Sequence, residues 1–363
     1  MVCCTRTRLP LHKVVSSPSA ASDRKTTEKE RLTAKASMKK ATIFKEAPAV
    51  EGGRDASSPG MSPSAQLVLD GIQREDRTVA FSVAGDPGGI PVLFLYPAGG
   101  NRLMLQMIQR AAPAASKLRL ICVNRPGKAG TTPAREAGPA AHATTVCEDI
   151  VAVLDHLNIS RVSVLFMCAG TPFALLFAAR FPDRITNQLI GFAAWVSPVD
   201  FGDARKLYKL GGSLPSWLIS PIVGSCFASC GASVRWLPDS ILVRTAELGL
   251  SEHEKKLFQQ QFPDPLDFVE LLRACCQESG GESADMSVLL SSLGDLDGSY
   301  SSVAASITLY HGQDDLLSPV DGAEWLAQQL PQATLSRLSS GTHEGVLRML
   351  HGEFPAALQT FLA

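Results

Sequence analysis

The sequence predicts an α/β fold: a mostly parallel central sheet flanked by helices, with an inserted helical cap. Two observations support this. Short apolar runs alternate with helical patterns over 78–196 and again from 306 onward, whereas the stretch between them has no convincing buried strand. Strands that alternate with helices of this length require right-handed crossovers and a sheet covered on both faces. A chain of 363 residues, 45% of them hydrophobic, is long enough for one large domain with an insertion.

The first part of the predicted core covers 66–197. Thr78–Val83 alternates polar and apolar residues as a half-buried strand does, and Pro91–Tyr96 is a continuous apolar run typical of a strand buried on both faces. The same two patterns recur further along. The expected strands are 78–83, 91–96, 118–123, 162–167 and 189–196, and the expected helices are 146–157 and 172–181.

The alternation stops after Ser197. Residues 198–297 contain Trp217, Trp236, several prolines and two helical stretches, 240–248 and 252–262, which predicts a helical cap. The second part of the core, 298–363, resumes the strand and helix pattern. Its expected elements are strands 306–310 and 334–338 and helices 322–329 and 354–362.

Residues 1–65 are rich in Ser, Lys, Arg, Glu and Pro, and their composition predicts a disordered arm. The first 22 residues carry basic and serine residues but no acid, as an organelle-targeting peptide does and as a plain basic arm also does. A cytoplasmic location is the expectation, with a mitochondrial or plastid location as the alternative.

Composition excludes several function classes. A net charge of -1 gives no field that would attract nucleic acid or an anionic membrane, and 218–234, the longest apolar candidate for a membrane span, is interrupted by Pro221. Nine cysteines without repeated close spacing indicate neither a disulfide framework nor a zinc site. There is no P-loop and no G-x-G-x-x-G between a strand and a helix, so no cofactor is expected. Composition favours no particular oligomeric state.

The most informative segment is Val164–Gly170, an apolar run that reaches Cys168 and then becomes helical. A nucleophile elbow, G-x-S-x-G, is a sharp strand-to-helix turn that needs small neighbours around its nucleophile. Ala169 and Gly170 meet that need, while Phe166 occupies the position of the first glycine. The pattern predicts an elbow that presents a thiol.

A thiol nucleophile needs a base and a carboxylate that orients the base. Asp315 follows the strand 306–310 and His343 follows the strand 334–338, which predicts both at the carboxyl edge of the sheet beside Cys168. Asp314 and Asp200 are alternative acids. The spacing Gly-x-x-Asp favours Asp315 over Asp314, and Asp200 is expected at a solvated cap entrance.

The other polar candidates have structural interpretations. His311 is expected to pack at a strand end, and Glu344 is expected to cap the helix after His343. The remaining histidines in the folded part are expected at ordinary surface or helix positions; they are His142, His156, His253 and His351.

At three motifs the chain resembles the hydrolase-1 group of the α/β-hydrolase superfamily. Tyr96-Pro97-Ala98-Gly99-Gly100 is similar to its His-Gly-x-Pro-Gly, Asn124-Arg125-Pro126-Gly127 to its Asp-Arg-Pro-Gly, and Cys168-Ala169-Gly170-Thr171-Pro172-Phe173-Ala174 to its elbow helix. The likeness runs from Thr78 to the C-terminus and departs at Tyr96, Pro97, Phe166 and Cys168. The resemblance implies Cys168 as nucleophile, Asp315 as acid, His343 as base, and the N–H groups of Ala98 and Ala169 as oxyanion donors.

The resemblance and the residues together predict a hydrolase of carboxylic esters or thioesters that works through an acyl-enzyme. Its partner would be a small apolar ester-like substrate. Two alternatives stay open: an acyltransferase that uses the same three residues, and a non-catalytic protein that binds a small ligand in the same pocket.

Overall fold

The computed structural model describes residues 67–202, 216–277 and 280–362. The predicted arm at 1–65 lies outside these residues. Among the helices that are described, none combines the length and the apolar character that a membrane crossing requires.

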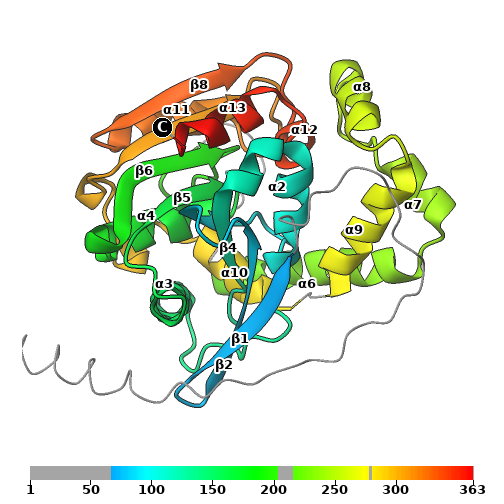
Figure 1. The fold of residues 1–363 in the computed structure, drawn as a ribbon. Coiled ribbons are helices and arrows are strands. Elements are labelled where there is room, and N and C mark those ends of the chain that lie inside the picture. Colours follow the sequence, from blue (N-terminus) through cyan, green and yellow to red (C-terminus); the bar gives the residue numbers. More distant parts are fainter. Residues whose placement is uncertain (1–66, 203–215, 278–279, 363) are drawn as a thin grey trace, which may run out of the picture. The chain divides into compact units, whose positions relative to one another are not determined.

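The described chain forms one eight-stranded sheet in the order β1-β2-β4-β3-β5-β6-β7-β8 (Figure 1). The β1–β2 and β2–β4 pairs are antiparallel, and every pair from β4 to β8 is parallel. The strands are β1 (Val68–Arg74), β2 (Arg77–Gly85), β3 (Ile90–Leu95), β4 (Leu118–Val123), β5 (Val162–Met167), β6 (Ile185–Phe192), β7 (Ser306–Gly312) and β8 (Ala333–Leu338). The predicted α/β class with a mostly parallel sheet is confirmed.

Helices cover both faces of this sheet. Ile150 and Phe177 share a buried cluster with Leu93, whereas Ile108 and Phe354 share the other cluster with Phe94, because successive residues of a strand face opposite sides. The core helices are α2 (Leu105–Ala111), α3 (Pro139–His156), α4 (Gly170–Arg180), α11 (Val320–Gln329), α12 (His343–Leu347) and α13 (Glu353–Thr360). Short 3₁₀ turns are η2 (Arg102–Met104), η3 (Pro113–Lys117), η4 (Pro182–Arg184), η5 (Gly294–Leu296) and η6 (Tyr300–Ser302).

Within the described residues between β6 and β7 lie five α-helices, which we call the cap. They are α6 (Ser216–Trp236), α7 (Asp239–Thr245), α8 (Glu252–Gln261), α9 (Pro265–Gln277) and α10 (Glu282–Leu289). Figure 1 shows α7, α8 and α9 on the side toward which the β8 arrow points. The helices expected at 240–248 and 252–262 are present as α7 and α8.

Some element boundaries differ from the prediction. The strand expected at 189–196 is β6, which begins at Ile185 and ends at Phe192. It ends there because Ala193 has a φ of 46° and its N–H donates to the carbonyl of Tyr310, which turns the chain out of the strand. The strand β1 and the helix α2 were missed; in β1 only Ile72 is buried, so the strand has no clear apolar alternation.

The phenylalanine at the first-glycine position is accommodated by the neighbouring strand. Phe166 pairs with Gly191 of β6, and a Cβ at Gly191 would lie 2.3 Å from two atoms of the Phe166 ring. The elbow lacks the first glycine of its motif, but Gly191 on the neighbouring strand has no side chain to clash with Phe166. The room for the aromatic ring comes from Gly191.

We therefore predict that Gly191→Ala lowers the free energy of unfolding by about 1–3 kcal/mol, because it overpacks a buried contact. Urea unfolding measures this. Gly71→Ala is the matched control, since a Cβ at that strand glycine would meet its nearest atom at an ordinary 3.6 Å. Equal stability of the two variants would contradict the packing explanation.

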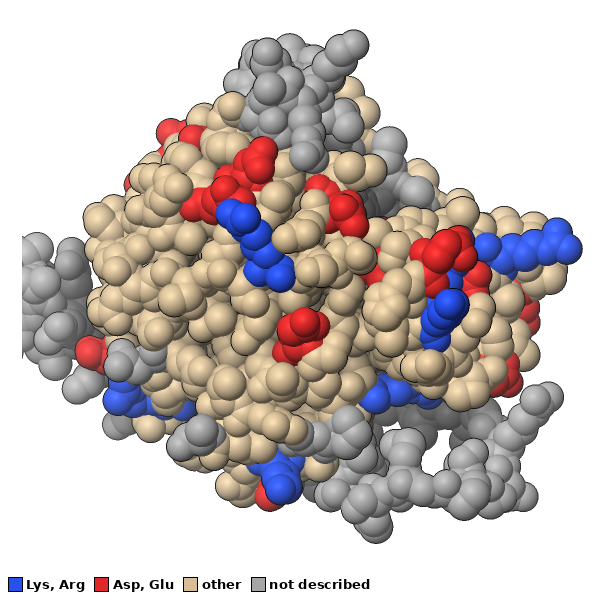
Figure 2. All heavy atoms as spheres, turned by 90° about the horizontal axis from the view of Figure 1, so that it is seen from above, with Lys and Arg blue, Asp and Glu red and all other residues tan. Residues whose placement is uncertain are grey.

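The surface in Figure 2 carries mixed charges without a basic field. Acidic and basic side chains gather over α8, where Lys255 pairs with Glu252, and a further pair joins Arg337 to Glu324. Between these groups the face is mostly uncharged. On this face, the mixed distribution agrees with the near-zero net charge.

Candidate active site

The turn between β5 and α4 has the geometry of a nucleophile elbow. Cys168 has a φ of 43°, in the left-handed region that residues with side chains rarely adopt. Its N–H donates to the carbonyl of Phe192 (3.0 Å), and its own carbonyl accepts from the N–H and hydroxyl of Thr171 (2.9 and 2.7 Å). A Cβ at Gly170 would lie 2.3 Å from the carbonyl oxygen of Leu95, so only glycine lets α4 start this close to β3.

Three of the predicted residues meet at this turn. Asp315 follows β7, and His343 is the first residue of α12. The Nδ1 of His343 lies 2.7 Å from Oδ2 of Asp315, and the His343 ring hydrogen-bonds the Cys168 side chain. Because Asp315 engages Nδ1, Nε2 is the nitrogen left to face the sulfur. All three residues are buried, with Cys168 5% exposed.

Both carboxylate oxygens of Asp315 are engaged. Its Oδ1 accepts from the N–H groups of Leu317 (2.9 Å) and Ser318 (2.7 Å), and its Oδ2 faces His343. His311 packs at the end of β7, as expected, with Nε2 bonded to the carbonyl of Ser318 at 2.7 Å and 3.5 Å from Oδ2 of Asp315. Burial lowers the pKa of His311, which favours a neutral ring there.

The imidazole of His343 favours its charged form. Burial lowers the pKa of His343, but the charge of Cys168 and the hydrogen bond to Asp315 outweigh burial and raise that pKa to about 10. The raised pKa favours a protonated His343 beside the Cys168 sulfur. Such a pair supplies both a nucleophile and a proton for a leaving group.

Two backbone N–H groups lie beside the sulfur. Ala169 forms one buried cluster with Cys168, and Ala98 packs against that cluster. Among the described residues, no acceptor receives a hydrogen bond from the N–H of Ala98 or of Ala169. The oxyanion role of these two N–H groups stays a prediction.

Arg125 supports the loop that carries Ala98. It donates to the carbonyl oxygens of Tyr96 (2.9 Å) and Pro97 (3.3 Å), and the Tyr96 hydroxyl accepts from the Arg125 N–H at 2.7 Å. The guanidinium also stacks 3.9 Å from the centre of the Tyr96 ring. Tyr96, which occupies the position of the motif's histidine, is thus held by hydrogen bonds and ring stacking with Arg125.

The cap helix α10 covers the sulfur with apolar side chains. Met286 and Leu289 share a cluster with Cys168, and Trp195 and Leu347 pack against it. Two buried ion pairs hold α10 in place. They are Arg125 with Asp285 (2.8 Å) and Lys128 with Glu282 (2.9 Å).

Sequence reasoning missed these ion pairs. The only signal was a pair of acids three residues apart, Glu282 and Asp285, in a helix that would otherwise present small and apolar residues. His142, expected at an ordinary surface or helix position, is buried in α3 and its Nε2 lies 3.0 Å from Asp285. It belongs to the same buried network.

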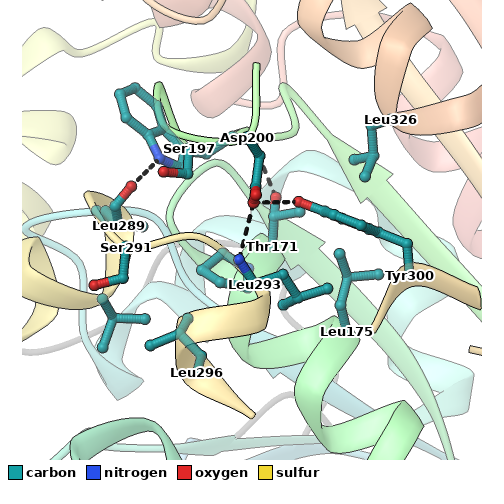
Figure 3. Close-up of a pocket in the computed structure, with 13 residues that line it drawn as sticks. Thr171, Leu175, Ser197, Asp200, Leu289, Ser291, Leu293, Leu296, Tyr300 and Leu326 are labelled. Carbon is teal, nitrogen blue, oxygen red and sulfur yellow. Dashed lines mark hydrogen bonds between the residues drawn. The ribbon is translucent and has the colours of Figure 1, made fainter. Parts of the chain in front are cut away.

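A small cavity of about 20 Å³, large enough for roughly one water, adjoins the site (Figure 3). Asp200 points into it and accepts from the hydroxyl of Tyr300 (2.7 Å) and the N–H of Leu293 (2.9 Å). Asp200 therefore lines a small cavity, with hydrogen-bond partners that the sequence did not indicate. It is half-buried with its own partners, and the acid that bonds His343 is Asp315.

Two further expectations are corrected on α12. Glu344 does not cap this helix; the cap is Thr342, whose side chain accepts from the N–H of Gly345, and Glu344 instead pairs with Arg348 (3.4 Å). His351 is buried rather than exposed, and its Nε2 lies 2.8 Å from Glu254. The other alternative acid, Asp314, is exposed, and its N–H donates to the carbonyl of Gly341.

Comparison with known proteins places the fold. No protein-family model matches the chain. Over 146 residues, the chain is 30% identical to the uncharacterized hydrolase YcgS of Bacillus subtilis; the match covers 39% of this chain and 47% of YcgS, so it spans about half of that relative.

Several solved structures match most of the described chain. An α/β-hydrolase fold protein from Nakamurella multipartita is 22% identical with a TM-score of 0.57, covering 81% of this chain and 99% of that one. The 2-hydroxy-6-oxo-6-phenylhexa-2,4-dienoate hydrolase of Rhodococcus sp. is 14% identical with a TM-score of 0.56, covering 82% and 100%. An esterase of Rhodococcus sp. is 17% identical with a TM-score of 0.53, covering 82% and 98%. The chain therefore has the α/β-hydrolase fold.

Proposed function

We propose that this protein hydrolyses carboxylic esters or thioesters through an acyl-enzyme formed on Cys168. The observation that supports this best is the position of His343, bonded on one side to Asp315 at 2.7 Å and on the other to the Cys168 side chain. A nucleophile, a base and a group that orients the base are the three parts that acyl transfer requires.

In the first half of the reaction, the Cys168 thiolate attacks the carbonyl carbon, and the oxygen of the tetrahedral intermediate accepts from the N–H groups of Ala98 and Ala169. The bond to the leaving group then breaks. The imidazolium of His343 gives its proton to the departing alkoxide or thiolate, which leaves a thioester on the enzyme and a neutral ring.

In the second half, the neutral His343 takes a proton from water while the hydroxide forms a bond to the thioester carbon. The oxyanion again accepts from Ala98 and Ala169. When this second intermediate collapses, the carbon–sulfur bond breaks and the carboxylic acid is released. The Cys168 thiolate and the His343 imidazolium are restored, with Asp315 holding the ring throughout.

The surroundings of the sulfur favour an apolar acyl group. Met286 and Leu289 of α10 and Trp195 present hydrophobic surface to Cys168. A small apolar acyl chain would displace water from these side chains on binding, whereas a charged one would lose its hydration without a partner. Esters or thioesters of short unbranched acids are therefore the first substrates to test.

Alkylation tests whether the thiol is active. We predict that iodoacetamide modifies Cys168 faster than Cys122 or Cys147, and that hydrolysis of a short p-nitrophenyl ester is lost at the same rate as Cys168 is modified. The reference thiols are both buried, and burial raises the pKa of Cys147 to about 12. Peptide mapping by mass spectrometry measures all three rates.

Added substrate should slow the modification of Cys168 and leave the reference cysteines unaffected. Modification of Cys168 no faster than that of Cys147 would refute the proposed nucleophile. A ligand that raises the melting temperature without being hydrolysed, together with an unreactive Cys168, would instead identify a binding protein.

A further inference from the structure

One buried carboxylate of the cap takes no part in the proposed reaction. Glu254 lies in α8 and is 0% exposed. Within its own helix it completes a capping box with Ser251, whose N–H and hydroxyl donate to Oε2 at 2.9 and 3.0 Å. A capping box usually sits at the protein surface and needs no buried acid. The remaining contacts of Glu254 explain its burial.

Those contacts are with the turn that carries the candidate base. The N–H of Thr342 donates to Oε1 at 2.9 Å, and its hydroxyl donates to Oε2 at 2.8 Å. His351, just beyond α12, donates from Nε2 to Oε1 at 2.8 Å. Thr342 directly precedes His343, so both polar groups of that residue are held by a helix 88 residues earlier in the chain.

The backbone beside Glu254 has room for its carboxylate only because residue 345 is a glycine. A Cβ placed on Gly345 would lie 1.8 Å from Oε1 of Glu254, so a side chain at that position would expel the acid. Burial raises the pKa of Glu254, but hydrogen bonds from His351, Ser251 and Thr342 outweigh burial and lower that pKa to about 2. The group is therefore an anion at neutral pH, surrounded by donors that favour the charge.

We infer that Glu254 is a positioning residue for His343: by fixing both polar groups of Thr342, it sets the direction in which the imidazole leaves the backbone. This inference rests on the proposed function of Cys168, Asp315 and His343. The cap would then contribute to the reaction, because its helix α8 helps to orient His343. A ring displaced by about 1 Å can cost on the order of 100-fold in rate.

Glu254→Gln tests the inference. A glutamine keeps the shape, but its NH₂ group cannot accept a hydrogen bond. Either the N–H of Thr342 and the His351 ring or the N–H of Ser251 therefore lose their acceptor, and the contacts at the turn must rearrange. We expect kcat for a short p-nitrophenyl ester to fall roughly 10- to 100-fold, with KM changed much less. Glu252→Gln is the matched control, because that glutamate lies on the same helix, is exposed and pairs only with Lys255 among the described residues.

A second readout does not require turnover. The short bond between Nδ1 of His343 and Asp315 should give a low-field proton NMR resonance, which is assigned by its absence in His343→Gln. We expect Glu254→Gln to shift or broaden this resonance and Glu252→Gln to leave it unchanged. If the parent protein proves inactive, the proposed function fails, while this resonance still decides the role of Glu254.

A purely structural role for Glu254 gives a different result. In that case Glu254→Gln lowers the melting temperature but changes neither the resonance nor kcat, and the inference is overturned. Should Glu254→Gln not fold, Thr342→Val removes the hydroxyl bond to Glu254 together with the N-cap bond from the Gly345 N–H, and Thr342→Ser should restore both. A normal resonance and a normal kcat in Thr342→Val would equally overturn the inference.

Discussion

Replacing Cys168 with alanine is expected to lower kcat for a short p-nitrophenyl ester about a thousandfold or more, since the covalent route is lost and only binding and the oxyanion donors remain. The Thr171 and Phe192 hydrogen bonds of the elbow involve backbone atoms of Cys168 and survive the change. The fold should therefore be intact, which circular dichroism and the melting temperature verify alongside steady-state kinetics.

Cys276→Ala is the control, because it removes a half-buried cap thiol that belongs to no part of the candidate site. It should keep the parental kcat. If Cys168→Ala hydrolyses the ester as fast as the parent protein, the activity arises elsewhere and the proposed mechanism is wrong.

The Cys168→Ala variant also tests why the pKa of His343 is raised. The charge of Cys168 is the largest of the influences that raise the pKa of His343 to about 10, so removing the sulfur should lower that pKa. NMR titration of the ring measures the change. In the parent, the raised pKa stabilises the fold fully below the ordinary value of 6.5, and this contribution is lost as the pH rises through about 10. Cys168→Ala should weaken this pH dependence of the free energy of unfolding.

The parts of the site that could be predicted are those set by local pattern. Cys168 was identified because an apolar strand, a nucleophile and two small residues follow one another directly. Asp315 and His343 were identified because each follows a strand of a parallel sheet, whose carboxyl ends share one edge. For these three residues, sequence order and strand direction together are enough to predict the neighbourhood that the structure shows.

The parts that could not be predicted depend on contacts between distant segments. Arg125 and Asp285 are 160 residues apart, and Glu254 and Thr342 are 88 apart. Glu254 lies in a cap helix that carries many polar residues, where a charged side chain is normally solvated. Asp285 lies in a helix of mostly small and apolar residues, which does not tell where its partner is. Nothing in the local pattern distinguishes a buried acid from an exposed one, so both pairs required the assembled cap.

The helix α6 shows that backbone structure, too, can depend on contacts that the local sequence does not predict. Pro221 was interpreted as a break in the segment 218–234, yet it lies with Gly224 inside the continuous helix Ser216–Trp236. Pro221 removes one helical N–H donor, and the helix continues past it. At Gly224 a Cβ would lie 2.6 Å from the backbone of Ser283, so the glycine permits α6 to cross α10 closely. Packing against α10 determines this helix more than its local preference does.

Arg125→Met is expected to lower the free energy of unfolding by about 3–5 kcal/mol, the cost typical of removing one partner of a buried ion pair. Arg125 is 2% exposed, and its Nε donates to Asp285 at 2.8 Å. Burial raises the pKa of Asp285, but Arg125 and His142 outweigh burial and lower that pKa to about 2. Without the guanidinium, the buried carboxylate keeps the hydrogen bond to His142 and the more distant charge of Lys128, or it takes up a proton.

Urea unfolding of Arg125→Met measures the loss, and Arg110→Met is the control. Arg110 pairs with Asp267 at 2.8 Å, but both side chains are exposed, so its removal should cost less than about 1 kcal/mol. A double variant, Arg125→Met with Asp285→Leu, should recover much of the stability, because it removes the uncompensated charge as well.

Recovered stability need not bring recovered activity, and this separates the two tasks of Arg125. Its bonds to the carbonyl oxygens of Tyr96 and Pro97 hold the loop that presents the Ala98 N–H, and methionine cannot replace them. The double variant should therefore fold and still hydrolyse esters poorly, by up to the 100- to 1000-fold typical of a lost oxyanion donor. A double variant that is both stable and fully active would show that the loop holds its shape without the arginine, and that Arg125 serves only to anchor α10.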